Sequence, residues 1–180
     1  AEQVPQVPVS AETPVQKEVE ISVPVETVPM IVTAPPVVSK PATSRTVPQV
    51  PVSKEREDYQ NAFDMLKEGR YKAAMTSFNR FIKDYPTSSY AGNSQYWLGE
   101  ANYVIKQFDL AISEFEKVLK LYPTSNKIPD AMLKLGYTYY EIRVNDKAKK
   151  ILHQLQKTHP KTTAARLAGK RLARMRKEGL

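Results

Sequence analysis

The 180-residue sequence contains no cysteine and no long apolar run. The absence of cysteine excludes disulfides, thiolate metal sites and cysteine nucleophiles from this sequence. No apolar stretch approaches the roughly 18 residues that span a bilayer, so we expect a soluble chain. The only histidines are His153 and His159, and neither a phosphate-binding glycine loop nor a zinc-protease motif occurs. The sequence therefore predicts a non-enzymatic protein with no catalytic, cofactor or metal site.

Residues 1–53 differ in composition from the rest of the chain. They hold ten of the 14 prolines and 14 valines, and they lack glycine and aromatic residues. The heptapeptide VPQVPVS occurs in them twice, at 4–10 and 47–53. Such a segment lacks the bulky side chains that offset ordering entropy, and its prolines favour extended geometry. We expect a disordered, stiff linker over 1–53 and a folded domain over 54–180, with a ligand for an aromatic-lined groove as the alternative role of the linker.

Charge is also distributed unevenly along the chain. Residues 1–53 carry a net charge of −2 and residues 54–142 are neutral, whereas residues 143–180 carry 12 basic side chains against Asp146 and Glu178, a net charge of +10. A basic end of this kind suits a partner surface of negative charge.

The second part of the chain repeats with a period of 37 residues. A repeat of this length indicates the fold class more strongly than any single predicted helix does. Small, apolar and proline positions recur together in this register: Ala62, Gly99 and Gly136; Ala74, Ala111 and Ala148; Phe78, Phe115 and Leu152; Pro86, Pro123 and Pro160. Because several classes of side chain keep the same spacing, we expect three copies of one unit, at about 55–86, 90–123 and 127–160.

Each copy is predicted to be a pair of amphipathic helices, because apolar residues recur at three- and four-residue spacing. The expected helices are 55–68, 71–84, 90–105, 108–121, 128–142, 145–158 and 162–177. Tight turns are expected between the paired helices, at Gly69-Arg70, Lys106-Gln107 and Val144-Asn145. Ser88, Ser125 and Thr162 each follow a proline by two residues and are candidate N-caps for the next helix.

Glycine inside a helix costs about 1 kcal/mol relative to alanine, so Gly99 and Gly136 need a compensating role. Their register with Ala111 and Ala148 predicts that small residues on both helices allow close approach, with Phe115 and Leu152 packed beside the contact.

Three segments resemble the tetratricopeptide repeat (TPR). They are NAFDMLKEGRYKAAMTSFNRFIKDYP, LGEANYVIKQFDLAISEFEKVLKLYP and LGYTYYEIRVNDKAKKILHQLQKTHP. The resemblance implies an all-α fold, a TPR-type α-solenoid of three helix hairpins. The apolar stripe of Ala164, Ala168, Leu172 and Met175 in the last helix, 162–177, would cap this solenoid.

Over roughly residues 59–172 the chain is also similar to a narrower family, the Tol-Pal-associated TPR proteins called cell division coordinators. The similarity is carried by AFDMLKEGRYKAAMTSFNRFIKDYPTSSYAGNSQYWLGEANY and KLGYTYYEIRVNDKAKKILHQL. It implies a periplasmic scaffold, exported by a signal peptide that has been removed. The implied partners are a TolA-like inner-membrane protein and a peptidoglycan synthase, and the implied role is to coordinate outer-membrane constriction with wall synthesis at division. Members of this family usually begin with a trimerising coiled coil, but residues 1–53 of this chain show no heptad pattern.

The TPR resemblance also implies a protein-binding groove lined by the first helix of each hairpin, where a partner helix or an extended segment would lie against aromatic rings. The expected lining residues are Tyr59, Phe63, Tyr96, Glu100, Tyr103, Tyr137, Tyr140 and Glu141.

The last predicted helix carries a basic face opposite its apolar stripe, formed by Arg166, Lys170, Arg174 and Lys177. One interpretation is a capping helix that keeps its outer face in water. The other is an electrostatic site for an acidic partner, an anionic surface or nucleic acid, although no nucleic-acid partner is expected. An outer-membrane assembly factor of related TPR design is a further alternative function.

Overall fold

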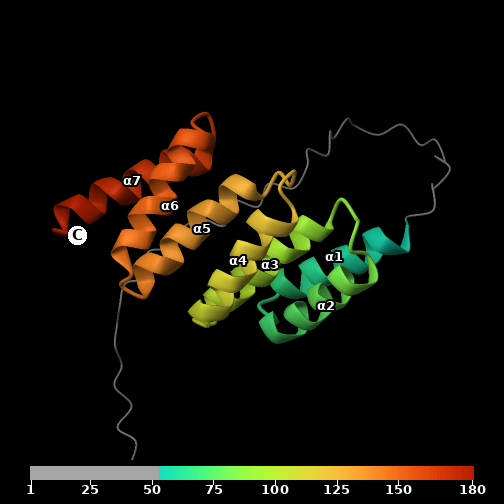
Figure 1. The fold of residues 1–180 in the computed structure, drawn as a ribbon. Coiled ribbons are helices and arrows are strands. Elements are labelled where there is room, and N and C mark those ends of the chain that lie inside the picture. The colour runs from blue at the N-terminus through green and yellow to red at the C-terminus, as the bar shows by residue number, and fades with distance from the viewer. Residues whose placement is uncertain (1–52) are drawn as a thin grey trace, which may run out of the picture. The chain divides into compact units, whose positions relative to one another are not determined.

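The computed structural model describes residues 53–180, which form seven helices. These are α1 (Lys54–Lys67), α2 (Tyr71–Asp84), α3 (Ala91–Val104), α4 (Phe108–Leu121), α5 (Ile128–Glu141), α6 (Asn145–Thr158) and α7 (Thr163–Lys177), shown in Figure 1. The predicted all-α solenoid is confirmed over these residues, and each predicted helix end lies within one residue of the observed end. The expected linker over 1–53 lies outside the described residues apart from Ser53.

The helices stack as hairpins. α1 packs on α2, α3 on α4 and α5 on α6, and each hairpin packs on the next through the contacts of α2 with α3 and of α4 with α5. The first helices of successive hairpins, α1, α3 and α5, also contact one another in order, and α7 continues this row by packing on α5 and α6. The predicted groove residues lie on three helices of this row, α1, α3 and α5.

The turns within the hairpins repeat the same backbone geometry. Gly69, Lys106 and Arg143 all have positive φ, at 74°, 61° and 63°. In each turn the following residue donates its N–H to a carbonyl five residues back, as Gln107 does to Asn102 at 2.9 Å. This is a helix C-terminus closed by a left-handed residue, for which glycine is the usual choice. The third turn is centred one residue earlier than predicted, at Arg143, because the 37-residue register places it there.

The N-cap prediction holds for only one of its three residues. Thr162 Oγ1 accepts a hydrogen bond from the Ala165 N–H at 3.1 Å and caps α7. Ser88 and Ser125 lie in the turns before α3 and α5, which begin at Ala91 and Ile128, and neither helix has a side-chain cap. Each serine hydroxyl instead accepts from the N–H two residues ahead, at 2.9 Å from Tyr90 and 3.2 Å from Lys127. The two serines therefore stabilise turns and not helix ends.

The core lies along the hairpin joints and contains most of the repeat positions. The small and apolar repeat residues are all buried, namely Ala62, Ala74, Phe78, Gly99, Ala111, Phe115, Gly136, Ala148 and Leu152, whereas Pro86, Pro123 and Pro160 are exposed at the hairpin ends. A Cβ at Gly99 would lie 2.6 Å from Phe115 Cε1, and one at Gly136 would lie 2.5 Å from Leu152 Cδ2. The large side chain thus packs directly over the glycine, which is closer than the sequence predicted.

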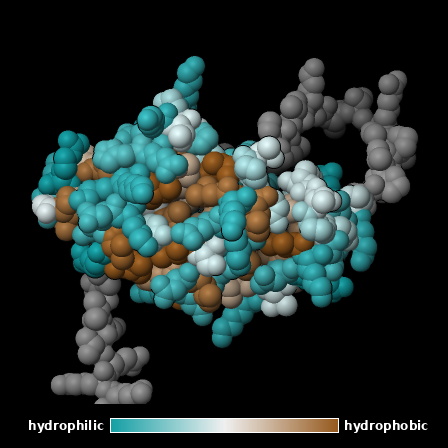
Figure 2. Space-filling model, in the orientation of Figure 1, coloured by the Kyte–Doolittle hydropathy of each residue, from teal (hydrophilic) through white to brown (hydrophobic). Residues whose placement is uncertain are grey.

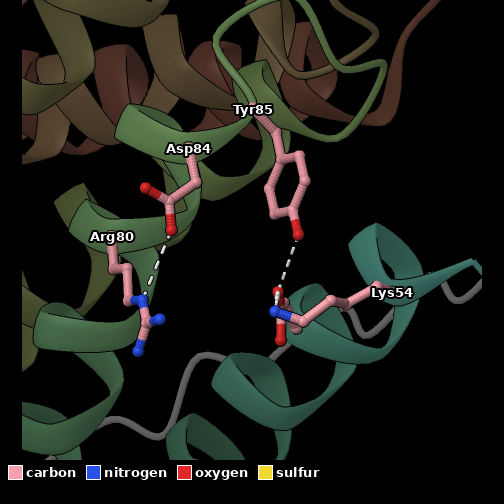
Figure 3. Close-up of polar contacts among 5 residues, drawn as sticks. Lys54, Arg80, Asp84 and Tyr85 are labelled. Carbon is pink, nitrogen blue, oxygen red and sulfur yellow. Dashed lines mark hydrogen bonds and ion pairs between the residues drawn. The ribbon is translucent and has the colours of Figure 1, made fainter.

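A polar contact ties the end of the first hairpin together. The Tyr85 hydroxyl, just after α2, donates to Asp58 Oδ2 of α1 at 2.9 Å (Figure 3). Lys54 approaches the same carboxylate at 3.9 Å, and Arg80 pairs with Asp84 at 3.3 Å. The hydrogen bond to Asp58 raises the pKa of Tyr85. The tyrosine before the proline therefore joins the C-terminal end of α2 to the N-terminal half of α1.

Candidate functional site

The predicted groove residues occupy the row of first helices. α1 carries Tyr59 and Phe63, α3 carries Tyr96, Glu100 and Tyr103, and α5 carries Tyr137, Tyr140 and Glu141. Their exposure differs. Tyr96, Glu100 and Tyr137 are buried, and Glu141 is exposed. Tyr59, Phe63, Tyr103 and Tyr140 are half-buried, so among the predicted rings these four have exposed surface.

An aromatic cluster joins α1 to α3. Tyr59 stacks on Tyr90 with ring centroids 4.8 Å apart, and Phe63 lies 5.1 Å from Trp97. The Trp97 indole N–H donates to the Tyr59 hydroxyl at 3.1 Å, and the Trp97 ring meets Tyr96 edge-on at 5.0 Å. These rings pack on one another around the buried Trp97, whose indole N–H is hydrogen-bonded, and form an aromatic platform. Trp97 is central to this platform, and the predicted lining set did not include it.

Cations cover several of the rings on α3 and α5. Lys127 lies 5.3 Å from the centroids of both Tyr96 and Trp97, and Lys134 lies 5.2 Å from the ring centroid of Tyr103. Arg171 of α7 lies 4.4 Å from the Tyr137 centroid and 4.7 Å from that of Tyr140. Cations within about 6 Å of a ring centroid are attracted by the ring face.

Sequence reasoning missed Lys134 and Arg171, although a signal for them was present. Trp97, Lys134 and Arg171 occupy the same position of the 37-residue repeat, one residue after the position of Tyr96. Following that register would have placed all three on the row of first helices.

A buried ion pair connects α3 to α5. Lys134 Nζ lies 2.7 Å from Glu100 Oε2, and the side chains are 24% and 8% exposed. Burial raises the pKa of Glu100, and the nearby Lys134 ammonium opposes that rise. Burial likewise raises the pKa of Tyr103 to about 12, with the Glu141 carboxylate adding to it. The Lys134–Glu100 ion pair thus links α5 to α3 on this surface.

The predicted basic residues Arg166, Lys170, Arg174 and Lys177 are all exposed on α7. The repeat register explains their position, because Lys170 corresponds to Leu133 and Tyr96, which are buried at 5% and 6% exposure. Lys177 corresponds in the same way to Tyr140 and Tyr103. The apolar stripe of α7 is buried against the preceding hairpin, with Ala168 fully covered. The basic face therefore lies where a further hairpin would have packed.

Within residues 53–180, none of the helices combines the length and the apolar character needed to cross a bilayer. The surface of the first helices offers partly exposed rings, an aromatic platform and charged side chains, which suit recognition of a protein segment.

Comparison with protein families gives two matches along the repeat domain. A family model described as an outer membrane lipoprotein matches residues 51–128, and a tetratricopeptide-repeat model matches residues 130–162. Among solved structures, the first TPR of Spaghetti (RPAP3), bound to the HSP90 peptide SRMEEVD, is similar with a TM-score of 0.54, 18% identity and coverage of 67% of this chain and 94% of that chain. The Arabidopsis OM64 TPR domain gives a TM-score of 0.55, 16% identity and coverage of 67% and 95%. These structural similarities show the fold.

Sequence relatives carry one name. The chain is 50% identical over 50 residues to the cell division coordinator CpoB of Pseudomonas putida, which covers 28% of this chain and 19% of that protein. It is 45% identical over 47 residues to the cell division coordinator CpoB of Escherichia coli, covering 26% and 18%. The aligned part thus spans about a fifth of these relatives. Residues 53–180 thus have the fold of a tetratricopeptide-repeat domain, and the sequence relatives of the chain are cell division coordinators.

Proposed function

We propose that this chain is a scaffold that acts in cell division, and that the row of first helices binds a segment of a Tol-Pal protein in the periplasm. The observation that carries the proposal is the name of the relatives, cell division coordinators, which are 45% and 50% identical to this chain over 47 and 50 residues. The half-buried rings of Tyr59, Phe63, Tyr103 and Tyr140 support the location of the binding surface. Binding there would help to coordinate outer-membrane constriction with peptidoglycan synthesis.

The partner surface is tested by titrating the full chain with the periplasmic part of a TolA-like inner-membrane protein and, separately, with a peptidoglycan synthase. The variant Tyr103→Ala/Tyr140→Ala is expected to weaken binding at least about tenfold, because interface energy concentrates in a few aromatic residues. Lys72→Ala/Lys83→Ala on α2 is the matched control and should bind like the wild type. Equal affinity for both variants would contradict the groove.

The cellular role is tested by complementation. A Pseudomonas putida strain that lacks its cell division coordinator is given this chain behind a signal peptide, and constriction defects are scored by microscopy. We expect rescue by the wild type and by the α2 control, and little rescue by Tyr103→Ala/Tyr140→Ala. Failure of all three to rescue, with normal export, would count against the division role.

The exposed basic residues of α7 favour a second candidate, electrostatic binding to an anionic surface or to nucleic acid. Such binding would weaken steeply with salt, by a log-log slope of about 0.9 per phosphate contacted in B-DNA. Titration with duplex DNA and with anionic vesicles at two salt concentrations tests it, and absent or salt-insensitive binding would remove it.

A further inference from the structure

A groove of about 520 Å³ lies between α4 and α6, away from the residues assigned to the partner surface above. α4 contributes Glu116, Leu119 and Lys120, α5 contributes Leu135 and Tyr139, and α6 contributes Lys147, Lys150, Ile151 and Gln154. α4 and α6 both pack on α5, so the side chains of α5 form the floor between them. Figure 2 shows that apolar surface in brown interrupts the hydrophilic surface at several places on the face drawn there.

The floor of this groove is apolar and continuous along α5. Leu135 and Tyr139 are separated by one helical turn, and Leu119 and Ile151 flank them from the two sides. Tyr139 is held in place because its hydroxyl donates to Glu116 Oε1 at 2.9 Å. Burial and this hydrogen bond raise the pKa of Tyr139 to about 12, so the ring stays neutral.

The corresponding joint between α2 and α4 is built differently. In the 37-residue register Ile151 corresponds to Glu114, which is buried, accepts a hydrogen bond from Gln95 and pairs with Lys117 at 2.8 Å. Internal polar contacts therefore occupy that joint. The groove between α4 and α6 replaces the buried carboxylate with an isoleucine and leaves apolar surface in its place.

The rim of the groove carries lysines that have no carboxylate partner among residues 53–180. Among residues 53–180, no carboxylate lies within 4.0 Å of the ammonium groups of Lys120, Lys147 or Lys150. Lys147 covers the Tyr139 ring at 5.3 Å. The only carboxylate in the lining is that of Glu116, which accepts from Tyr139. Three lysines against one glutamate give the rim a net positive charge.

We propose that the groove between α4 and α6 is a second protein-binding site, which takes an acidic amphipathic helix from a partner protein. The apolar stripe of the helix would lie on Leu119, Leu135 and Ile151, along the axis of α5. Its flanking carboxylates would pair with Lys120 and Lys150 on the two rims. A helix in a groove places residues of one face at three- and four-residue spacing on such a floor. Together with the row of first helices, this site would let one domain hold two partners.

The experiment uses the full chain and labelled synthetic peptides of about 18 residues, long enough for stable helix formation on binding. One peptide has leucine at three- and four-residue spacing and glutamate at the flanking positions, and a matched peptide has lysine in place of glutamate. A third peptide has the sequence of residues 17–32 of this chain, which is acidic and rich in valine. Affinity is measured by fluorescence anisotropy at low and high salt.

We expect the glutamate peptide to bind and the lysine peptide not to bind. The variant Lys120→Glu/Lys150→Glu should bind the glutamate peptide about tenfold or more weakly than the wild type does, since two attractive pairs become repulsive. The same variant should bind the lysine peptide. The control Lys72→Glu/Lys83→Glu on α2 carries the same charge change outside the groove and should bind like the wild type. Ring resonances of Tyr139 should shift in NMR spectra.

Three results would overturn the proposal: no binding of the glutamate peptide, equal affinity for both charge-reversed variants, or tighter binding of the 17–32 peptide. The last would identify the groove as a site for the chain itself. Tyr103→Ala/Tyr140→Ala should leave the affinity for the glutamate peptide unchanged. The proposed partner surface on the first helices and the proposed site in this groove can therefore be rejected independently of each other.

Discussion

At the scale of single residues, glycine determines how closely the helices of a hairpin approach. Gly99 faces the ring of Phe115 and Gly136 faces Leu152, and both large side chains are fully buried. A well-packed interior cannot give way to an added methyl group without moving its neighbours. The helix-propensity cost of a central glycine is therefore offset by the packing that it permits.

Gly99→Ala should lower the free energy of unfolding by about 1 to 3 kcal/mol, because its Cβ would lie 2.6 Å from the fully buried ring of Phe115. The matched control is Gly169→Ala on α7, whose Cβ would meet only the end of the Gln156 side chain, at 2.8 Å. The control should be neutral or gain up to about 1 kcal/mol from helix propensity. Chemical denaturation of both variants tests this, and equal effects would contradict the packing account.

Glu100 gives a prediction about pH. Its pKa is raised in the folded state by burial, so between the ordinary pKa and the raised pKa the folded protein binds more protons than the unfolded chain. The contribution of this group is therefore fully present at low pH and is lost as the pH rises through the folded pKa. The free energy of unfolding of the wild type, relative to Glu100→Gln, should fall as the pH rises above the ordinary glutamate range. Denaturation curves at several pH values measure it, and a difference that is constant with pH would exclude this role.

At the scale of helices, similar sequences end in different local structures. The Pro-x-Ser and Pro-x-Thr segments share one repeat position, yet only Thr162 caps a helix. Before α3 and α5 the chain makes a turn first, and the helices begin at Ala91 and Ile128. The side-chain oxygens of Ser88 and Ser125 are used by those turns. The difference arises because α7 begins at the residue that follows Thr162, whereas α3 and α5 begin three residues after Ser88 and Ser125.

Thr162→Ala should lower the free energy of unfolding by about 1 kcal/mol, since an orphan N–H at the start of α7 would lose its acceptor. Ser125→Ala is the comparison, because it removes a turn contact at 3.2 Å and no helix cap, and its effect should be smaller. Thermal unfolding of the two variants tests the order, and a larger loss for Ser125→Ala would show that the turn contributes more than the cap.

At the scale of the whole domain, α7 ends the solenoid by changing the chemistry of one repeat position. Where α3 and α5 carry Tyr96 and Leu133 in buried positions, α7 carries the exposed Lys170. Solenoids need a polar outer face on their terminal helix, because an open apolar end would pack on another molecule. An exposed, charged outer face of this kind is what a capping helix requires.

Lys170→Leu/Lys177→Tyr restores the residue types of α5 to the end of α7 and should cause concentration-dependent self-association. Contacts between unlike ends of two molecules do not close, so we expect a series of oligomers. Sedimentation velocity over a range of concentrations measures this. The control Lys72→Leu/Lys83→Tyr makes the same substitutions on α2. Equal association of both variants would indicate non-specific hydrophobic association and not end-to-end stacking of the domain.

The sequence by itself determined the helices, their hairpins and the TPR fold, because a 37-residue period combined with 3.6-residue periodicity leaves few other ways to bury the apolar positions. It also determined which similarity to expect. Only the tertiary structure decided which of the predicted groove residues are buried and which cations cover which rings. It also decided that Ile151 lines an apolar groove between α4 and α6, whereas Glu114, at the same repeat position, makes polar contacts at the joint between α2 and α4. Those properties depend on side chains from helices that are distant in sequence, and their contacts follow from the stacking of hairpins and not from local spacing.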